Sequence, residues 1–305
     1  MKKHISLFLF LIATMLWGAA FSAQKAAGVL NAFIIGGIRG IVAALFLLLV
    51  IPLVDKLLGN KRGFFGNAKL KFLDFNRKEL VGGVICGIIL SSANAFQQFG
   101  ISDGTDAGKS AFITALYVVI VPILALVLGK RSSLNVWISI AIAVIGFYLL
   151  CIKDGFSVEL SDMLVLVCAF IFAAHIIAID KFVEGCDGVR MSCIQFFVTF
   201  VINTAIALIL RVDIDFALIG DVLSSLLYLG ICSSGIAYTL QIVGQQNVTP
   251  AMASIVLSLE SVFGVAFAAI IHGERMSVRE YIGCAIVFIA VILSQIDFHK
   301  FKKPQ

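Results

Sequence analysis

The chain consists largely of long apolar runs, separated by short clusters of charged residues and glycines. A helix that crosses a membrane needs about 20 mostly apolar residues, and in a bilayer it satisfies all of its backbone polar groups internally. The pattern therefore predicts an all-α integral membrane protein with ten transmembrane helices. Their expected ranges are 5–23, 31–54, 80–101, 108–128, 134–151, 160–180, 191–210, 218–243, 250–271 and 277–296.

Two stretches of this pattern are ambiguous. The first apolar run, 5–23, superficially resembles a signal peptide because two lysines precede it. It is longer than a typical signal core, contains Trp17 and Phe21, and runs into further apolar sequence, so we expect a retained helix. The long polar break at 55–79 holds glycines among charged residues, and we expect a cytoplasmic connector there rather than a soluble domain.

A segment in the second half of the chain repeats a segment that lies 144 positions earlier. The matching residues are Gln97, Gly100, Thr105, Ser110, Gly129 and Arg131 in the first copy and Gln241, Gly244, Thr249, Ser254, Gly273 and Arg275 in the second. In a strongly apolar chain, such self-similarity is typical of transporters built from two repeats. We predict a first repeat at 1–152 with helices one to five and the connector, a second repeat at 158–298 with helices six to ten, and a cytoplasmic tail at 299–305.

Basic residues are distributed unevenly between the expected loops. If the N-terminus is cytoplasmic, 16 of the 23 lysines and arginines fall in cytoplasmic segments and six on the other side, with Arg39 left inside the second helix. The positive-inside rule therefore places both termini in the cytoplasm. Five helices per half is an odd number, so the second half enters the membrane from the opposite face. The expected fold is two inverted five-helix repeats.

Composition agrees with this assignment and excludes several other classes. Hydrophobic residues make up 61% of the chain and charged residues only 13%, far from the average of soluble proteins. The net charge of +5 is explained by the cytoplasmic loops, so no nucleic-acid partner is implied. The seven cysteines show no CxxC spacing, so we expect neither a disulfide framework nor a metal site, and no cofactor.

A set of residues spread over both halves forms a recognisable pattern. It consists of Ala13, Trp17, Gly18 and Phe21 in the first helix, Arg39 early in the second, and Leu259-Glu260 followed by Gly273-Glu274-Arg275. This pattern resembles the EamA family of the drug/metabolite transporter superfamily, and the resemblance covers essentially the whole chain. Gln241 with Gln245 is similar to one bacterial branch whose substrates are mostly undefined.

The resemblance implies a carrier in the cytoplasmic (inner) membrane of a bacterium, with a substrate cavity between helices one to four and six to nine. Helices five and ten would serve as scaffold, and members commonly export amino acids or other small metabolites. One residue departs from the pattern, because a proline usually follows the Leu-Glu pair and this chain has Ser261. Since a proline kinks a helix, its absence predicts a stiffer or displaced hinge in the ninth helix.

Two charged residues fall inside expected helices. Glu260 is near mid-membrane, where an ionisable group is costly and often functional; it would bind a cationic group, exchange a proton or fix the fold by a hydrogen bond. Arg39 lies roughly 12 Å below the outer surface at about 1.5 Å per residue. It would either snorkel to the interface, bind an anionic group of the solute, or pair with Glu260.

Two expected helices each carry a polar face at helical spacing. The residues are Asn94, Gln97 and Gln98 in the third helix and Tyr238, Gln241 and Gln245 in the eighth. Residues so spaced share one side of a helix, and repeat symmetry places the two faces opposite each other. They would line one central site, or hold helices together by hydrogen bonds.

Four further residues are candidates for the cavity wall. His175, deep in the sixth helix, would relay protons or act as a packing residue. Trp17 and Tyr117 would form aromatic walls or simply pack, and Gln195 in the seventh helix leaves the same choice open.

The predicted function is that of a secondary transporter. It would move a small metabolite (an amino acid, amine or drug-like solute) by alternating access, as an exporter, driven by protons or by the solute gradient. The alternatives are a non-transporting scaffold or receptor, and an intramembrane hydrolase; the segment 230–235 lacks the GxSG order that a serine hydrolase would suggest, and no Walker motif is present. We therefore expect no enzyme and no catalytic residue, with the solute and the lipid bilayer as partners, in a monomer or homodimer.

Overall fold

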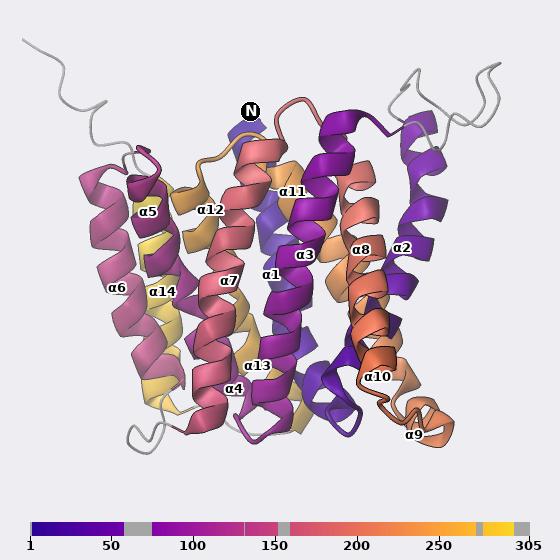
Figure 1. Ribbon diagram of the computed structural model, residues 1–305. Helices are drawn as coiled ribbons and strands as arrows, with labels where there is room; N and C mark the ends of the chain where they lie inside the picture. The colour runs from indigo at the N-terminus through magenta and orange to yellow at the C-terminus, as the bar shows by residue number, and fades with distance from the viewer. Residues whose placement is uncertain (1, 58–74, 131, 152–158, 273–276, 296–305) are drawn as a thin grey trace, which may run out of the picture.

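The structure, a computed structural model, describes residues 2–57, 75–130, 132–151, 159–272 and 277–295. All regular secondary structure in these residues is helical, and the helices stand side by side in one bundle (Figure 1). The all-α class is therefore confirmed. Most of the expected connector at 55–79, Arg131, the Gly273-Glu274-Arg275 turn and the tail at 299–305 lie outside the described residues.

The helices follow the predicted ranges within a few residues. In the first half they are α1 (Lys2–Ala27), α2 (Ala32–Leu57), α3 (Arg77–Ser102), α4 (Ala107–Ala115), α5 (Tyr117–Val127) and α6 (Leu134–Cys151). In the second half they are α7 (Leu160–Phe182), α8 (Gly188–Ile209), α9 (Phe216–Asp221), α10 (Leu223–Leu227), the π-helix η2 (Tyr228–Tyr238), α11 (Thr239–Gln245), α12 (Pro250–Leu257), α13 (Glu260–His272) and α14 (Val278–Gln295).

Eight helical stretches among the described residues are long and apolar enough to cross a membrane. Each has an apolar window of 18 residues with at most two charged residues, as a lipid-embedded helix requires. The chain is therefore a multi-pass membrane protein. The count of ten membrane-spanning helices and the inverted order of the halves stay predictions.

Two of the expected helices are broken near their middle. α4 ends at Ala115 before α5 begins, and α12 ends at Leu257 before α13 begins at Glu260. At the second break the Ser258 hydroxyl donates to the Ile255 carbonyl at 2.7 Å, and the Leu259 N–H donates to the carbonyl three residues back at 3.1 Å. Such serine back-bonding and i→i−3 bonds bend a helix without proline. The ninth expected helix is therefore interrupted just before Ser261 without a proline. A stiffer or displaced hinge stays a prediction.

The eighth expected helix, 218–243, is not one regular α-helix. Its central part is the π-helix η2, and a separate short helix, α9, precedes it. A π-helix has i→i+5 bonding and is rare, and such segments are frequent at functional sites. Here the Ser233 carbonyl of η2 accepts a hydrogen bond from Trp17 Nε1 of α1 at 3.0 Å. The irregular segment is thus tied to a helix of the other half.

Glycines let α8 pack closely between α2 and α3. A Cβ on Gly40 would lie 2.6 Å from the Phe200 backbone nitrogen, and one on Gly83 would lie 2.6 Å from the Ile194 Cβ. Small residues at i and i+4 allow such an approach of two membrane helices. The pairs Gly36/Gly40 and Gly83/Gly87 therefore bring helices of the first half against a helix of the second.

Replacing Gly40 by alanine is expected to lower stability by about 1–3 kcal/mol, because the new methyl group meets backbone atoms of α8 that cannot move aside. The measurement is the midpoint of thermal unfolding in detergent. Gly108→Ala is the matched control, since it is also a helical glycine but nothing lies within 4 Å of its Cβ position. Equal midpoints for the two variants would contradict the close packing of α2 on α8.

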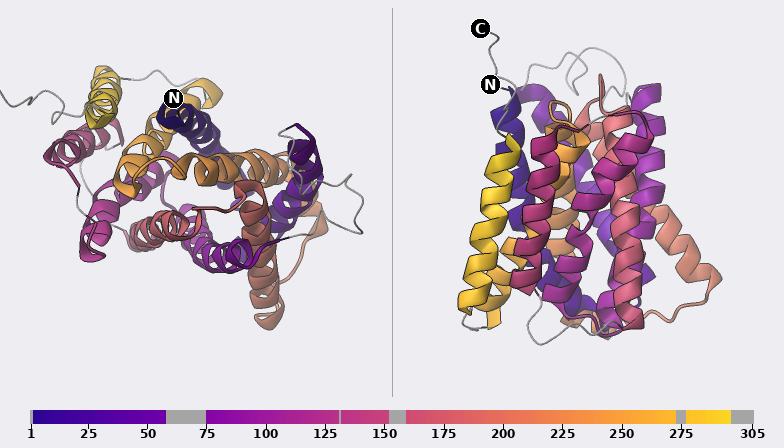
Figure 2. Two further views of the ribbon diagram at one scale, coloured as in Figure 1. Left: turned by 90° about the horizontal axis from the view of Figure 1, so that it is seen from above. Right: turned by 90° about the vertical axis from the view of Figure 1, so that its left-hand side faces the viewer.

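Helices of the two halves alternate across the bundle. α2 packs on α8, α3 on α7 and α8, and α1 on α13. α6 and α14 pack against each other and lie together at one edge when the bundle is seen from above (Figure 2). Helices of both halves surround the middle of the molecule, so both halves contribute to whatever lies there, whereas α9 lies at an edge (Figure 1).

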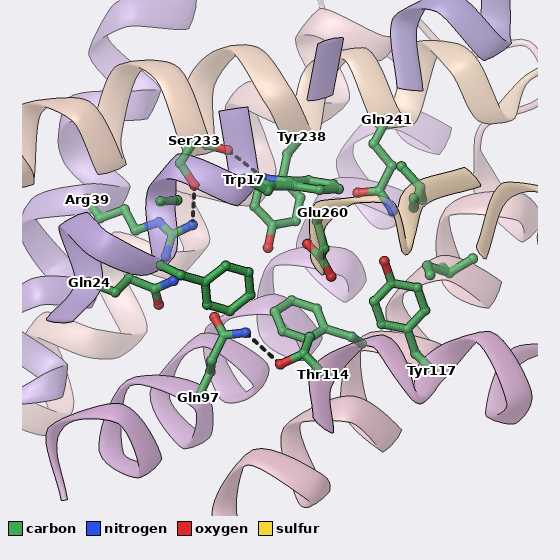
Figure 3. A pocket seen from close by; sticks show the side chains of 15 residues that line it. Trp17, Gln24, Arg39, Gln97, Thr114, Tyr117, Ser233, Tyr238, Gln241 and Glu260 are labelled. Carbon is green, nitrogen blue, oxygen red and sulfur yellow. Dashed lines mark hydrogen bonds between the residues drawn. The ribbon is translucent and has the colours of Figure 1, made fainter. Parts of the chain in front are cut away.

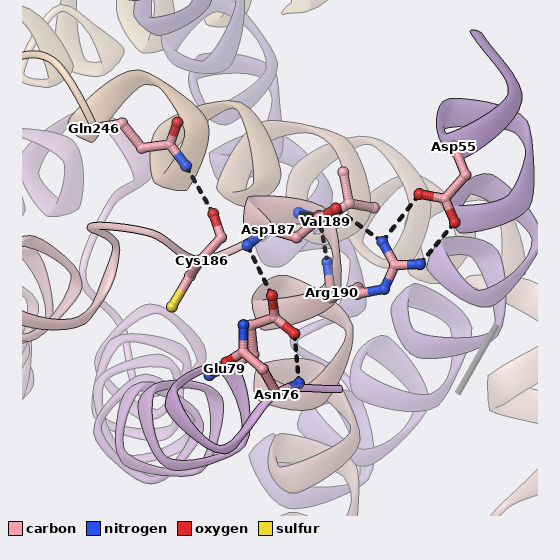
Figure 4. Close-up of polar contacts among 8 residues, drawn as sticks. All are labelled: Asp55, Asn76, Glu79, Cys186, Asp187, Val189, Arg190 and Gln246. Atoms are coloured by element: carbon pink, nitrogen blue, oxygen red, sulfur yellow. Dashed lines mark hydrogen bonds and ion pairs between the residues drawn. The ribbon is translucent and has the colours of Figure 1, made fainter. Parts of the chain in front are cut away.

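A buried group of charged residues joins α2, α3 and α8 at the end of the bundle that holds the N-terminus (Figure 4). Arg190 binds Asp55 with two hydrogen bonds, Nη1 to Oδ1 at 3.0 Å and Nη2 to Oδ2 at 2.6 Å, and also binds Asp187 at 2.8 Å. The Asp187 N–H donates to Glu79 at 3.0 Å. Since Arg190 and Asp55 are each only 1% exposed, the pairing compensates for removing both charges from water.

At the opposite end of the bundle, Asp162 joins α7 to α4. Its carboxylate accepts from Lys109 Nζ at 2.5 Å and from Thr105 Oγ1 at 3.1 Å. Thr105 and Lys109 belong to the first half of the chain and Asp162 to the second. Polar contacts therefore link the two halves at both ends of the bundle.

Candidate functional site

A pocket lies in the middle of the bundle (Figure 3) and has about 420 Å³ of space not filled by atoms, including its open part. Its wall comes from α1, α2, α3, α4, α5, α7, η2, α11, α12 and α13. The lining residues are Trp17, Ala20, Phe21, Gln24, Arg39, Gln97, Thr114, Tyr117, Phe172, Ile176, Ser233, Tyr238, Gln241, Leu257 and Glu260.

Seven of the sequence-predicted candidates line this pocket. They are Trp17, Arg39, Gln97, Tyr117, Tyr238, Gln241 and Glu260. They come from six separate helical segments and the π-helix, and from both halves of the chain. The bundle thus brings together residues that the sequence only suggested were related, although a binding role for them remains a prediction.

The other four candidates lie in the surrounding protein and do not line the pocket. His175 Nε2 and Gln195 Oε1 are 2.9 Å apart, and Gln245 Nε2 donates to the Ile176 carbonyl at 3.0 Å. Asn94 is buried, and neither atom of its amide has a hydrogen-bond partner within the described part of the chain. The His175 ring is 5.9 Å from the Tyr238 ring, so it supports the pocket wall from behind.

Glu260 provides the acidic group of the pocket. The break after Leu257 makes it the first residue of α13, and its side chain is 6% exposed. The Tyr117 hydroxyl points toward the carboxylate and interacts with it (Figure 3), and no other described residue bonds to Glu260 Oε1. Buried polar groups are nearly always hydrogen-bonded. This carboxylate is therefore placed to accept a hydrogen bond from a bound cationic group.

Arg39 provides the basic group of the pocket. It is only 4% exposed. The alternative that its side chain snorkels to the interface is therefore wrong. Its Nε donates to the Ser234 hydroxyl at 2.5 Å and its Nη2 to the Ser233 hydroxyl at 3.0 Å. Within the described residues it forms no ion pair, and the pairing with Glu260 is not formed.

Aromatic rings and amides make up much of the remaining wall. The rings of Trp17 and Tyr238 are 4.7 Å apart at 60°. Gln97 Nε2 donates to Thr114 Oγ1 at 3.0 Å, and Gln241 Oε1 has no partner among the described residues. An apolar wall with a few polar groups of fixed orientation is typical of a site for a small organic molecule.

Three polar lining residues were missed by sequence reasoning: Gln24, Thr114 and Ser233. Gln24 is seven residues after Trp17, a spacing that places both on one side of a helix and so gave a usable signal. Ser233 is five residues before Tyr238. Residues five apart lie nearly on the same side of a π-helix, but not of an α-helix. No α-helical periodicity would have identified Ser233.

The described residues contain no group of three or more histidine, cysteine or acidic side chains that would hold a metal ion. The pocket wall instead combines apolar and aromatic side chains with hydrogen-bonding groups and two charges of opposite sign. Such a wall is suited to reversible binding of an organic solute.

The helical bundle and its membrane-spanning stretches define a multi-pass membrane protein with a central pocket. The sequence model of the EamA-like transporter family matches at residues 4–152 and 160–295. The chain belongs to this family, which confirms the resemblance seen in the sequence.

Two individual proteins are similar to this chain. A protein of Archaeoglobus fulgidus described as an uncharacterized transporter is 28% identical over 294 residues, which cover 96% of this chain and 86% of that protein. A solved crystal structure of a protein matches with a TM-score of 0.76 over 98% of this chain and 99% of that chain. At 13% identity, this second likeness concerns the fold alone.

Proposed function

We propose that the protein is a secondary transporter that moves a small polar metabolite across the membrane, with the solute bound between Glu260 and Arg39. One observation carries the proposal: a central pocket, with walls from both halves of the chain, holds a buried carboxylate and a buried guanidinium that do not pair with each other. Burying two such charges is costly. A solute with complementary groups would offset that cost.

The proposed transport cycle is alternating access by two inverted repeats of five membrane helices, 1–152 and 158–298. Binding at the interface of two repeats is typical of such carriers, and Arg39 and Glu260 come from different repeats. Rocking of one repeat against the other would expose the pocket to each side in turn. Both termini are expected in the cytoplasm of a bacterial cell. The expected direction of transport is export. The driving force would be protons exchanged at Glu260, or the gradient of the solute itself.

A counterflow assay tests the proposal without assuming a coupling ion. Purified protein in liposomes is loaded with one unlabelled solute at a time, and entry of the same radiolabelled solute is measured. The panel contains the common amino acids, small amines and cationic drugs, and we expect saturable exchange for at least one amino acid or amine. Liposomes without protein provide the background. Folded protein that exchanges no member of the panel would overturn the proposed function.

Alternating access makes a second prediction at the Asp162 end of the bundle. Thr105 and Asp162 lie in different halves with their oxygens 3.1 Å apart, so cysteines at both positions can be joined by an oxidant. In a background without the native cysteines, oxidation is expected to stop counterflow, and a reductant should restore it. Each single-cysteine variant controls for the loss of the native contact. Full exchange by the crosslinked protein would exclude separation of α4 from α7 during transport.

A further inference from the structure

Two arginines among the described residues are deeply buried, and they differ in how their charge is compensated. Arg190 is bound by the carboxylates of Asp55 and Asp187. Arg39 is 4% exposed, yet its partners in the described residues are two neutral hydroxyl groups, those of Ser233 and Ser234. A buried charge is normally paired. The missing negative charge at Arg39 is therefore one that a bound ligand can supply.

The geometry leaves one side of the Arg39 guanidinium available. The serine hydroxyls accept from Nε and Nη2, while Nη1 has no acceptor among the described residues. A guanidinium has five N–H donors in a plane and binds a carboxylate with two parallel hydrogen bonds. Because Arg39 and Ser233 line the pocket, the end formed by Nη1 and Nη2 is the part that a solute can reach.

The serines are held near Arg39 by the irregular backbone of η2. A Cβ at Gly230 would lie 2.5 Å from the Val42 side chain, and one at Gly235 would lie 2.7 Å from the Phe46 ring, so η2 approaches α2 closely at both glycines. The Ser233 carbonyl is fixed by Trp17 at 3.0 Å. These contacts set the position of both hydroxyls, and the hydroxyls in turn orient the guanidinium.

We propose that Arg39, positioned by Ser233 and Ser234, is a carboxylate-binding subsite at one end of the pocket. The inference rests on the proposed transport function and narrows the solute to a small molecule with one carboxylate for Arg39 and one ammonium group for Glu260, as in an α-amino acid. A phosphate group carries more charge than one guanidinium neutralises. Ser233 and Ser234 are positioning residues, because they act on the solute through Arg39.

The test compares an amino acid that exchanges in the counterflow assay with its amide and with the amine left after decarboxylation. For the unaltered protein, the acid is expected to compete for transport at least about tenfold better than either analogue, since a hydrogen bond to a charged group is worth about 1.5–3 kcal/mol. The double variant Ser233→Ala/Ser234→Ala should lose about tenfold for the acid and leave the analogues unchanged. Threonine at both positions keeps the hydroxyls and should restore the preference.

Ser139→Ala is the matched control, because Ser139 is a buried serine whose hydroxyl donates within α6, away from the pocket. Equal competition by the acid and its analogues with the unaltered protein would overturn the carboxylate subsite, as would a preference for a phosphorylated analogue. An equal loss for acid and analogues in the alanine variant would assign the serines a structural role only. If no solute in the panel exchanges, the transport function fails. Binding to Arg39 is then measured by the thermal stabilisation that each acid and its amine give. Equal shifts in the unfolding midpoint for acid and amine would overturn the subsite.

Discussion

Replacing Glu260 by glutamine is expected to reduce the initial rate of counterflow by roughly thirtyfold or more at a low solute concentration. Glu260 is 6% exposed and forms no ion pair within the described residues, so in our proposal its charged partner is the ammonium group of the solute. Removing one member of a buried charge pair costs about 2–5 kcal/mol, and each 1.4 kcal/mol is a factor of ten in affinity. Glutamine keeps the shape of the side chain and removes only its charge.

Glu184→Gln makes the same chemical change at an exposed position outside the pocket and should leave the rate unaltered. A rate for Glu260→Gln equal to that control would remove Glu260 from the binding site. The role in proton exchange is judged separately, from uptake driven by an imposed pH gradient. A Glu260→Gln carrier with unchanged proton-coupled flux would show that another group carries the proton.

Replacing Arg190 by methionine is expected to destabilise the protein by about 3–5 kcal/mol, because it leaves the Asp55 carboxylate buried without its bidentate partner. The loss is measured as a fall in the unfolding midpoint in detergent. The double variant Arg190→Met/Asp55→Leu should recover much of that loss, since the buried Asp55 charge is removed as well. Asp187 also loses Arg190, but it still accepts from backbone N–H groups at the start of α8.

Lys25→Met is the matched control for the Arg190 variant. It breaks an ion pair with Asp106 whose side chains are 55% and 80% exposed, and exposed pairs contribute only about 0–1 kcal/mol. An Arg190→Met protein as stable as the Lys25→Met protein would mean that the buried cluster contributes little. It would also remove the energetic reason to distinguish the charge of Arg190, which carboxylates compensate, from the charge of Arg39, which hydroxyl groups contact.

The predicted helix ranges show how far local patterns reach. Helix positions follow from runs of apolar residues, because a membrane helix satisfies its backbone within itself wherever the run is long enough. Gly40 and Gly83 lie where two helices approach, and the small-residue spacing that allows such an approach is itself a local pattern. The break before Glu260 was not, because it depends on how the Ser258 hydroxyl bonds to the preceding turn.

Local patterns did not predict which polar residues line the pocket. Seven candidates line the pocket, while His175, Gln195, Asn94 and Gln245 do not, although polarity and depth in a helix were the same kind of evidence for all of them. Which side of a helix faces the pocket depends on its rotation against its neighbours. That rotation is set by packing across the whole bundle.

The sequence by itself determined the membrane class, the approximate helix ranges, the internal repeat and the family, because each depends on hydrophobicity or residue identity along the chain. Only the tertiary structure decided that Arg39 is buried against Ser233 and Ser234, that Asp55 and Arg190 meet although 135 positions separate them, and that Glu260 begins a helix. The physical reason is that the cost of burying a charge depends on its partners in space. In this bundle those partners come from the other half of the chain.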